Sequence, residues 1–532
     1  MIAFIARRRY IAGLMAASLL CGCAAGPDFQ RPAAPDAHGY APRPLPAQTA
    51  SAPVAQGAAQ HFTTDKDLPF DWWTLFRSPQ LNALVERAFK ANPSVEAAQA
   101  ALRQAQENVV AQQGFFYPTV GVSYSPSRTK LAGNMGGNSP GVQGNGRVIQ
   151  TYSNAAGPAP YNAPVYYNFH IAQLTVGYVP DVFGANHRQV ESAAAQAHAQ
   201  QFELEATYIT LASNVVGAAL QEATLRAQIA AMQQVVTASR KSLDISRQRF
   251  QLGDVSGLDV ATQETASAEA QQALLPLQKQ LEQTRDLLRA LTGNAPDREV
   301  PETFQLASLH LPQELPLSLP SRLVEQRPDV RAAEEQLHAA SAEYGVAIAN
   351  RLPQFAVIGA VGGMAATPGW MFKAGGGFFD LAADISQTIF DGGTLRARSR
   401  AAQQALAQAA AQYRSTVIAA LQNVADTLHA IDTDAAGLQA AAQAAQAAGK
   451  IRDITRRQYD DGYVSYQDLL AAEQGYQLAA FNLAQAQATR LGDTAALYVA
   501  LGGGWWHRPD ADAELAHPDQ PLAVTAQGEH AR

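Results

Sequence analysis

The pattern of apolar and polar residues along this 532-residue chain predicts two pairs of strands, each followed by very long helical segments. Apolar residues occupy every second position in 119–124, and the same alternation runs through 379–386, where Phe379 and Leu381 flank Asp380. A period of two places unlike residues on the two faces of a strand. Segments 169–178 and 354–362 complete a set of four predicted strands, each about ten residues long.

Two long helical segments follow the strand pairs, at about 186–252 and 394–461. Both are crowded with Ala and Gln, which are strong helix formers. At a rise of 1.5 Å per residue each would be roughly 100 Å long. That length far exceeds the average helix of a globular protein, so the pattern indicates a rod or a tube.

The chain contains an internal duplication. Asn92-Pro93-Ser94-Val95 reappears as Arg327-Pro328-Asp329-Val330, and the stretch 250–256 reappears at 459–465. The offset falls from 235 residues (92 to 327) to 209 (250 to 459) because the first half carries 26 extra residues in a Gly-, Asn-, Ser- and Pro-rich segment. That composition predicts a long surface loop between Tyr124 and Phe169. Each half then follows one order: medium helix, strand, loop, strand, very long helix, tight turn, long helix.

The first 23 residues predict an export signal that ends at a lipid-attachment site. Three arginines precede the apolar stretch 11–20, which is too short to span a bilayer. Leu20-Cys21-Gly22-Cys23 resembles a bacterial lipobox, so cleavage would leave Cys23 at the N-terminus with a lipid on its thiol. Cys21 would be lost, which rules out a disulfide in the mature chain. An ordinary signal peptide with incidental cysteines is the alternative.

The charge balance argues against a nucleic-acid partner. The chain has 39 Lys and Arg against 46 Asp and Glu, a net charge of −7, and no basic cluster that would neutralise phosphates. It also lacks the H-E-x-x-H and G-x-S-x-G motifs, and its 11 His are scattered. We therefore expect no enzyme activity, no cofactor and no metal site.

No later run of 18 apolar residues predicts a transmembrane helix, so a membrane role must use the strands. Four strands leave two unpaired edges, which hydrocarbon does not tolerate, and bacterial membrane barrels have at least eight strands. Several chains would have to share one barrel, and three copies would supply twelve strands. Asp380 and Asp384 would then face a water-filled lumen. A soluble antiparallel sheet shows the same alternation, so this alternative stays open.

Five short motifs are spread over the chain from Cys23 to Trp506. They are Gly22-Cys23 with Gly26-Pro27-Asp28-Phe29, Asp71-Trp72-Trp73 to Phe76, Asp181-Val182-Phe183-Gly184, Phe390-Asp391-Gly392-Gly393 and Ala500-Leu501-Gly502-Gly503-Gly504-Trp505. Together with the duplication they resemble the outer membrane factor family of efflux lipoproteins (TolC-like, NodT/OprM branch). The resemblance implies an α+β membrane protein. In it, a homotrimer forms a twelve-stranded β-barrel, with four strands per chain, that is continued by a long periplasmic α-helical barrel.

The resemblance also implies localisation and partners. Such a protein is a passive exit channel for drugs or other small toxic compounds, lipid-anchored in the outer membrane of a Gram-negative bacterium and extending into the periplasm. A periplasmic adaptor (membrane fusion) protein would link it to an inner-membrane transporter, commonly of the resistance-nodulation-division type. A channel of the same fold for protein secretion and a secreted or surface-anchored coiled-coil stalk are competing interpretations, although a stalk has no use for duplicated strand pairs.

The two helix-turn-helix tips, 253–257 and 462–465, contain the candidate gate. By resemblance, Asp259, Asp468 and Tyr459 line a periplasmic aperture that acidic rings keep closed. The alternative for the two aspartates is a charge favoured by the helix dipole. The family often carries a further carboxylate three residues after the second aspartate, where this chain has Ala471, so a second acidic ring is in doubt.

The same tips contain the candidate docking residues for the adaptor. Small or apolar side chains permit the close approach of a helical hairpin, and the four candidates are Gly253, Val255, Gly462 and Val464. The alternative is that they are turn glycines and local hydrophobic contacts.

We expect five segments along the chain: a signal peptide at 1–22, a lipid anchor and extended linker at 23–65, a first efflux repeat at 66–300, a second at 301–506 and a disordered tail at 507–532. A Pro-, Ala- and Gln-rich composition favours the extended linker. Trp505 and Trp506 are expected to seal the end of the last helix.

Overall fold

The computed structural model describes residues 24–33, 39–41, 46–64, 66–131 and 165–509. The predicted signal peptide, Cys23, the Gly-rich segment 132–164 and the tail after Pro509 lie outside these ranges. The chain forms two compact units. The first, called the sheet unit here, contains residues up to Phe29, Glu107–Ala195 and His338–Gln408; the second, the helical unit, contains Gln30–Gln106, Gln196–Leu337 and the chain from Ala409 onward.

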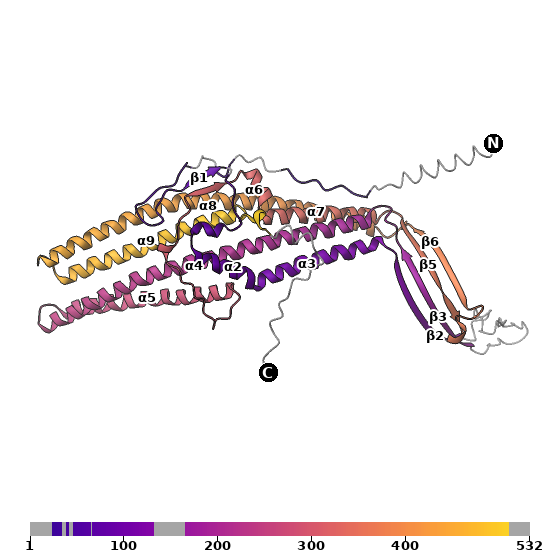
Figure 1. Cartoon of the computed structure of the whole chain (residues 1–532), viewed down its shortest axis with the longest axis horizontal. Helices are drawn as coiled ribbons and strands as arrows, with labels where there is room; N and C mark the ends of the chain where they lie inside the picture. Colours follow the sequence, from indigo (N-terminus) through magenta and orange to yellow (C-terminus); the bar gives the residue numbers. More distant parts are fainter. Residues whose placement is uncertain (1–23, 34–38, 42–45, 65, 132–164, 510–532) are drawn as a thin grey trace, which may run out of the picture. The chain divides into compact units, whose positions relative to one another are not determined.

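The sheet unit holds one four-stranded antiparallel sheet, whose strands lie side by side in the order β2-β3-β5-β6 (Figure 1). The strands are β2 (Thr119–Leu131), β3 (Val165–Tyr178), β5 (Gln354–Ala365) and β6 (Gly377–Ser386). All four predicted strands are present, but β2 continues past Tyr124. The apolar alternation stops there because Pro126, Arg128 and Lys130 take the next positions on the same face, while backbone pairing with β3 goes on.

The register of the sheet confirms two unlike faces. Directly paired residues project to the same side of a sheet, and one such row joins Val122, Leu174, Val361 and Phe379. The adjacent row on the other side joins Gly121, Thr175, Ala360 and Asp380. The first side is called the apolar face from here on; it comprises Val120, Val122, Tyr124, Leu174, Val176, Val357, Val361, Phe379, Leu381 and Ile385.

The helices match the predicted lengths closely. The long helices α4 (Ala185–Gln251) and α8 (Thr394–Asp460) have 67 residues each, and α5 (Gly257–Leu291) and α9 (Tyr466–Ala500), which follow them, have 35 each. The medium helices α3 (Pro93–Gln113) and α7 (Pro328–Ala349) both begin at a proline, a position where its missing N–H is not needed. The order of elements therefore repeats in the two halves.

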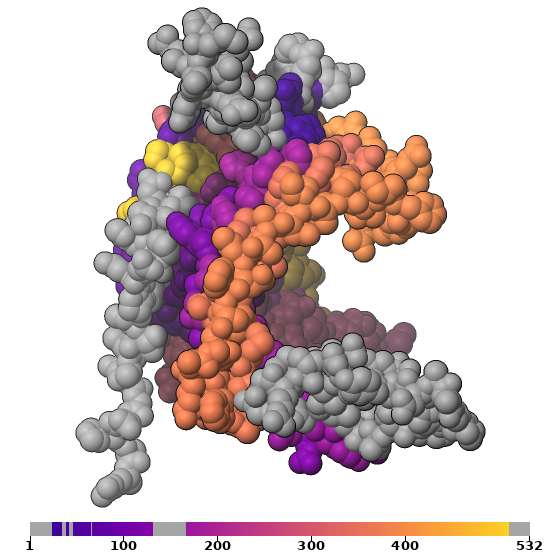
Figure 2. Space-filling view, turned by 90° about the vertical axis from the view of Figure 1, so that its right-hand side faces the viewer, coloured from indigo at the N-terminus to yellow at the C-terminus, as the bar shows by residue number. Residues whose placement is uncertain are grey.

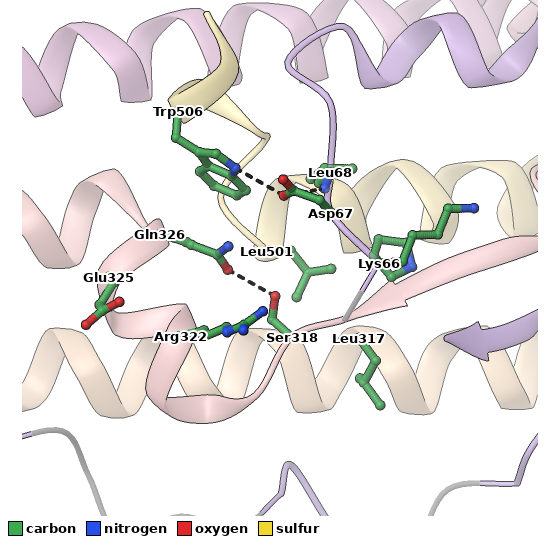
Figure 3. Close-up of a pocket in the computed structure, with 11 residues that line it drawn as sticks. Lys66, Asp67, Leu68, Leu317, Ser318, Arg322, Glu325, Gln326, Leu501 and Trp506 are labelled. Atoms are coloured by element: carbon green, nitrogen blue, oxygen red, sulfur yellow. Dashed lines mark hydrogen bonds between the residues drawn. The ribbon is translucent and has the colours of Figure 1, made fainter. Parts of the chain in front are cut away.

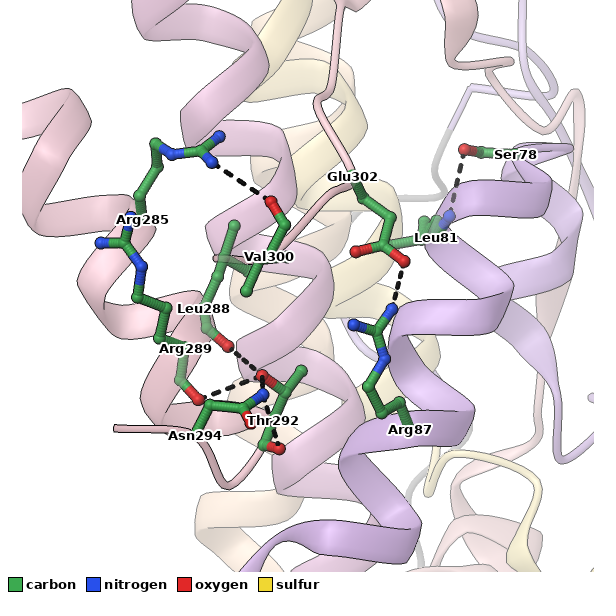
Figure 4. A network of polar contacts seen from close by, with 10 residues as sticks. All are labelled: Ser78, Leu81, Arg87, Arg285, Leu288, Arg289, Thr292, Asn294, Val300 and Glu302. Atoms are coloured by element: carbon green, nitrogen blue, oxygen red, sulfur yellow. Dashed lines mark hydrogen bonds and ion pairs between the residues drawn. The ribbon is translucent and has the colours of Figure 1, made fainter. Parts of the chain in front are cut away.

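Several short elements of the helical unit were not predicted. Strand β1 (His61–Thr64) pairs in parallel with β4 (Glu314–Leu317), so the end of the expected linker 23–65 belongs to a folded sheet. Helices α2 (Pro79–Ala91) and α6 (Pro320–Gln326) precede α3 and α7. The chain after α5 is tied back by polar contacts: Glu302 pairs with Arg87 of α2, and Arg285 of α5 donates to the Val300 carbonyl at 3.2 Å (Figure 4).

Aromatic side chains form part of the core of the helical unit. The 3-10 helix η1 (Trp72–Phe76) contains two fully buried rings, Trp72 and Phe76, and Trp72 packs against the equally buried Tyr498 of α9 at a centroid distance of 5.8 Å. The motif around Trp72 is therefore a packing motif. Among the described helices, none has an apolar stretch long enough to cross a membrane.

Candidate channel and gate residues

The two helix tips share one backbone conformation and lie at the same end of the helical unit (Figure 1). Gly253 follows α4 with φ +84°, and Gly462 follows α8 with φ +80°. Only glycine adopts this left-handed conformation without strain, and it is common just after a helix. A Cβ atom at either position would meet no other atom within 4 Å. Backbone conformation, rather than close contact within this chain, therefore requires these two glycines.

Asp259 and Asp468 each complete a capping box at the start of a helix. The Ser256 N–H donates to Asp259 Oδ2 at 2.8 Å, and the Ser465 N–H donates to Asp468 Oδ2 at 2.9 Å. In return each serine hydroxyl accepts from the backbone N–H of the aspartate at 3.3 Å. The serine hydroxyl, which also donates to the carboxylate, is the main reason that the pKa of both aspartates lies below its usual range.

The sequence contained the signal for these caps, since Ser-x-x-Asp before a helix is a known start pattern. The aspartates lie in the first turn of α5 and α9, directly after the tips. Both aspartates therefore stabilise the N-terminus of a helix. Both carboxylates are also exposed, so their charge is available to a pore as well.

Aromatic side chains lie at the tip between α8 and α9. Tyr459, near the end of α8, packs against Tyr466 at the start of α9 with a centroid distance of 5.3 Å. Tyr463 is 81% exposed in this chain, whereas the docking candidates Val255 and Val464 are half-buried. The tips therefore combine two exposed carboxylates with exposed aromatic surface.

Two aspartates at the junctions between strands and long helices were missed as functional candidates. Asp181 accepts from the backbone N–H groups of Asn186 (3.0 Å) and His187 (2.8 Å) at the start of α4. Asp391 accepts from those of Gly393 (2.8 Å) and Leu395 (2.6 Å) at the start of α8, and these backbone donors lower its pKa. The Asp-Val-Phe-Gly and Phe-Asp-Gly-Gly motifs therefore start the two longest helices.

The residues after Cys23 are docked on the sheet unit. The Ala25 N–H donates to the Phe183 carbonyl at 2.9 Å, and the buried Arg188 binds Asp28 Oδ1 at 2.6 Å. Gly26 has φ +95°, and a Cβ atom there would lie 2.6 Å from the Gly345 Cα. The Gly-Pro-Asp-Phe motif thus holds the start of the chain against α4 and α7. Cys23 itself lies outside the described residues.

The described chain also extends past the predicted boundary at the C-terminal end. The Trp505 indole N–H donates to the Gln326 carbonyl at 2.6 Å. The Trp506 indole N–H donates to Asp67 Oδ1 at 3.1 Å, beside a cavity of about 390 Å³ that both residues line (Figure 3). Both tryptophans therefore tie down the end of α9, as expected. Packing continues past Trp506, however, because Arg508 is buried against Glu205 at 2.6 Å.

Asp380 and Asp384 lie on the side of the sheet opposite the apolar face, and both are exposed. Within the described ranges, no group of three or more His, Cys, Asp or Glu side chains is close enough to share a metal ion.

An exposed apolar sheet face, followed by long helices with exposed tips, is the architecture of an outer-membrane channel protein. The sequence model of the outer membrane efflux protein family matches residues 84–294 and 319–503. The chain belongs to this family.

Curated relatives and solved structures agree. The pyoverdine export outer membrane protein OpmQ of Pseudomonas putida is 27% identical over 464 residues, covering 87% of this chain and 94% of the relative. The toluene efflux pump outer membrane protein TtgC of the same species is 26% identical over 512 residues, covering 95% and 97%. The solved structure of the outer-membrane channel OprN superposes on this chain with a TM-score of 0.72 and 25% sequence identity, covering 91% of this chain and 100% of OprN. The Campylobacter jejuni outer membrane channel CmeC superposes with a TM-score of 0.77 and 21% identity, covering 93% of this chain and 98% of CmeC. The chain is an outer-membrane efflux channel of a Gram-negative bacterium.

Proposed function

We propose that three copies of this chain assemble into the passive exit channel of a tripartite efflux pump. Twelve strands, four from each copy, form a β-barrel in the outer membrane, and the long helices continue it as an α-barrel through the periplasm. A periplasmic adaptor protein and an inner-membrane transporter of the resistance-nodulation-division type complete the pump. Relatives are named for pyoverdine export and toluene efflux, which supports small organic compounds as the exported class.

The observation that carries this proposal is the exposed apolar face on a sheet with two open edges. Val122 is 81% exposed and Leu381 77% in the single chain, and the residues of β6 (orange) lie at the surface along the strand (Figure 2). Within the described residues, β2 and β6 each pair with one strand only. Hydrocarbon covers apolar side chains but does not satisfy backbone groups at an edge. Neighbouring copies that pair edge to edge would satisfy both requirements.

The site residues take roles within this assembly. Asp380 and Asp384 face the lumen, where their charge favours cations. Asp259, Asp468 and Tyr459 form the periplasmic aperture, and Gly253, Val255, Gly462 and Val464 contact the adaptor. The lipid on Cys23 anchors each copy beside the strand-helix junction, a position supported by the docking of the next residues through Arg188 and Asp28.

The two efflux repeats are residues 66–300 and 301–506, after a signal peptide at 1–22 and an anchor segment at 23–65. Two observations support this division: the equal lengths of α4 and α8, and the two separate segments that the family model matches.

The proposal is tested on membrane fractions and in planar bilayers. We expect the protein in outer-membrane detergent extracts, migrating as a heat-labile trimer, and forming ion-conducting channels after reconstitution. A strain that lacks the chain should become more sensitive to small toxic compounds, and the adaptor should co-purify with the channel. A water-soluble monomer that keeps its sheet folded without detergent would overturn the proposal, and shed soluble protein would favour the stalk.

A further inference from the structure

The apolar face of the sheet becomes basic at one end. After Tyr124, the β2 positions on this face are Pro126, Arg128 and Lys130, and their partners in β3 are His170, Asn168 and Tyr166. The other end of these strands is joined to the helices, because β2 starts shortly after α3 and β3 ends shortly before α4. The basic end is therefore the end of the strands farther from the helices along the chain. In a channel whose helices extend into the periplasm, the basic end is the outward end.

The turn between β5 and β6 lies over the same face of the sheet, at the row where the basic end begins. A Cβ atom on Gly363, which belongs to the row of Tyr124 on the apolar face, would lie 3.1 Å from the Phe372 ring. The turn therefore folds over this face. Its neighbouring residues Trp370 and Lys373 form a cation–π pair, with the Lys373 Nζ 5.0 Å from the ring centroid, and Lys130 Nζ lies 5.4 Å from the ring of Tyr166. Phe372, Trp370 and Tyr166 are all exposed.

The positive charge at this end has no acidic partner among the described residues. The sequence contains no Asp or Glu from 108 to 180 or from 344 to 379. Arg128, Lys130 and Lys373 are exposed. Within the described residues, none of the three forms an ion pair with an acidic side chain. Aromatic rings and lysines next to an apolar band are typical of the level at which hydrocarbon meets headgroups.

We propose that the basic and aromatic side chains at this end of the sheet bind the headgroup of a phosphorylated glycolipid in the outer leaflet. Arg128 matches a phosphate with its planar fork of donors, Lys130 and Lys373 add point charges, and the rings of Tyr166 and Trp370 cover the apolar faces of the sugars. The acyl chains then lie along Val122, Leu174 and Phe379. The inference rests on the proposed function, because it requires the apolar face to contact lipid.

The test uses the full-length channel in detergent and diphosphorylated lipid A as the probe, with binding followed by native mass spectrometry. A basic residue near a charged lipid surface contributes about 1 kcal/mol, so Arg128→Gln, Lys130→Gln and Lys373→Gln should each weaken binding about fivefold, and the triple variant about a hundredfold. Lipid A without phosphates should bind the unaltered channel as weakly as diphosphorylated lipid A binds the triple variant. Lys130→Arg should retain binding, and Lys279→Gln, which removes an exposed lysine of α5, is the matched control without effect.

Equal binding of the triple variant and the unaltered channel would overturn the inference. Displacement of lipid A by millimolar inorganic phosphate would also overturn it, since that result indicates a site for free phosphate. Conductance in planar bilayers of the same preparations separates this inference from the proposed function. Channels of normal conductance with unchanged lipid binding refute only the lipid site, whereas protein that forms no channels refutes the proposed function.

Discussion

At the residue scale, Asp468 has two separable properties: it caps α9 through Ser465, and it places an exposed charge at the tip. A structural cap and a gate both predict that removal of the side chain matters, so a single alanine variant does not distinguish them. The serine does, because it contributes to the cap and carries no charge.

We expect Asp468→Asn to raise single-channel conductance in planar bilayers, because the variant loses the charge but keeps an oxygen that accepts from the Ser465 N–H. Asp468→Ala should raise conductance as well and leave the trimer intact. Ser465→Ala should leave conductance unchanged while it lowers the free energy of unfolding by about 1 kcal/mol. Unaltered conductance in Asp468→Asn would contradict the gate assignment.

A second residue-scale effect is a pH dependence at Asp493. Burial, and then a hydrogen bond to Asp434 of α8, raise the pKa of this carboxyl from 3.8 to about 7. A group whose pKa is raised on folding stabilises the fold fully below its unfolded value, and this stabilisation is lost as the pH rises through the folded value. The contact between α8 and α9 should therefore weaken between about pH 4 and pH 7.

In Asp493→Asn, the side-chain amide N–H replaces the carboxyl proton as a hydrogen-bond donor to Asp434 at every pH. We expect it to raise the free energy of unfolding at about pH 8 and to change it little at about pH 4. Denaturant titration at the two pH values measures the difference, and the same change at both would show that the shared proton is not the cause.

At the element scale, α4 and α9 are held in strict antiparallel register by polar pairs. The Gln228 side-chain amide donates to Gln485 Oε1 at 2.9 Å. The side-chain amides of Gln474 and Gln467 donate to the hydroxyls of Ser239 (2.7 Å) and Ser246 (2.6 Å), respectively. From pair to pair, the partners move 11 and then 7 residues along α4 and the same numbers back along α9. Together these steps are about five turns at 3.6 residues per turn, so the seam stays on one side of each helix.

A double-mutant cycle tests this ladder. Gln474→Leu leaves the buried Ser239 hydroxyl without this partner, which should cost about 1–3 kcal/mol of unfolding free energy. Adding Ser239→Ala should recover part of the loss, because no buried hydroxyl then remains unpaired. Strictly additive effects would mean that the two side chains are not coupled.

The sheet gives a prediction with a built-in control. Leu381 and Ala382 are adjacent and both exposed in β6, but only Leu381 lies on the apolar face. An arginine that faces lipid near the bilayer midplane costs about 2–4 kcal/mol, whereas a lumen-facing one costs little. Leu381→Arg should therefore reduce heat-labile trimer in outer-membrane extracts, and Ala382→Arg should not. Equal tolerance of both is the outcome that a soluble sheet would give.

At the scale of the whole chain, the last helix holds the N-terminal segment. Arg490 of α9 is fully buried, and it donates to Thr49 Oγ1 (2.8 Å) and to the carbonyls of Gln56 (3.1 Å) and Ala58 (2.8 Å). Burial lowers its pKa. A buried guanidinium satisfied by neutral oxygens fixes the position of a whole backbone segment, since each carbonyl that it binds would otherwise be unpaired.

We expect Arg490→Met to lower the free energy of unfolding by more than about 2 kcal/mol, because several buried carbonyls lose their donor. Limited proteolysis should then cut within residues 49–60, which are protected in the unaltered protein. Arg398→Met on the exposed surface of α8 is the matched control. Protease resistance of the Arg490 variant would show that β1 pairing alone holds the segment.

The local sequence was enough to determine the lengths and order of the repeated elements. The ends of α4 and α8 lie within one residue of their predicted positions because glycine after a helix and Ser-x-x-Asp before the next are signals read within a few residues. Alternation predicted the strands around 119–124 and 379–386, and it breaks down toward the basic end, where Arg128 of β2 and His170 of β3 lie on the apolar face. The family was recognisable from motifs that cap helices and pack aromatic rings.

Only the tertiary structure decided which distant segments meet. Arg490 and residues 49–60 are more than 400 positions apart, and β1 pairs with β4 across about half of the chain. Such contacts leave no periodic trace, because burial of a polar side chain depends on the surfaces that surround it and not on its neighbours in sequence. For the same reason the sequence did not reveal the basic end of the apolar face. It is seen only in the structure, where strand pairing places Lys130 beside Tyr166 and the β5–β6 turn lies over the sheet.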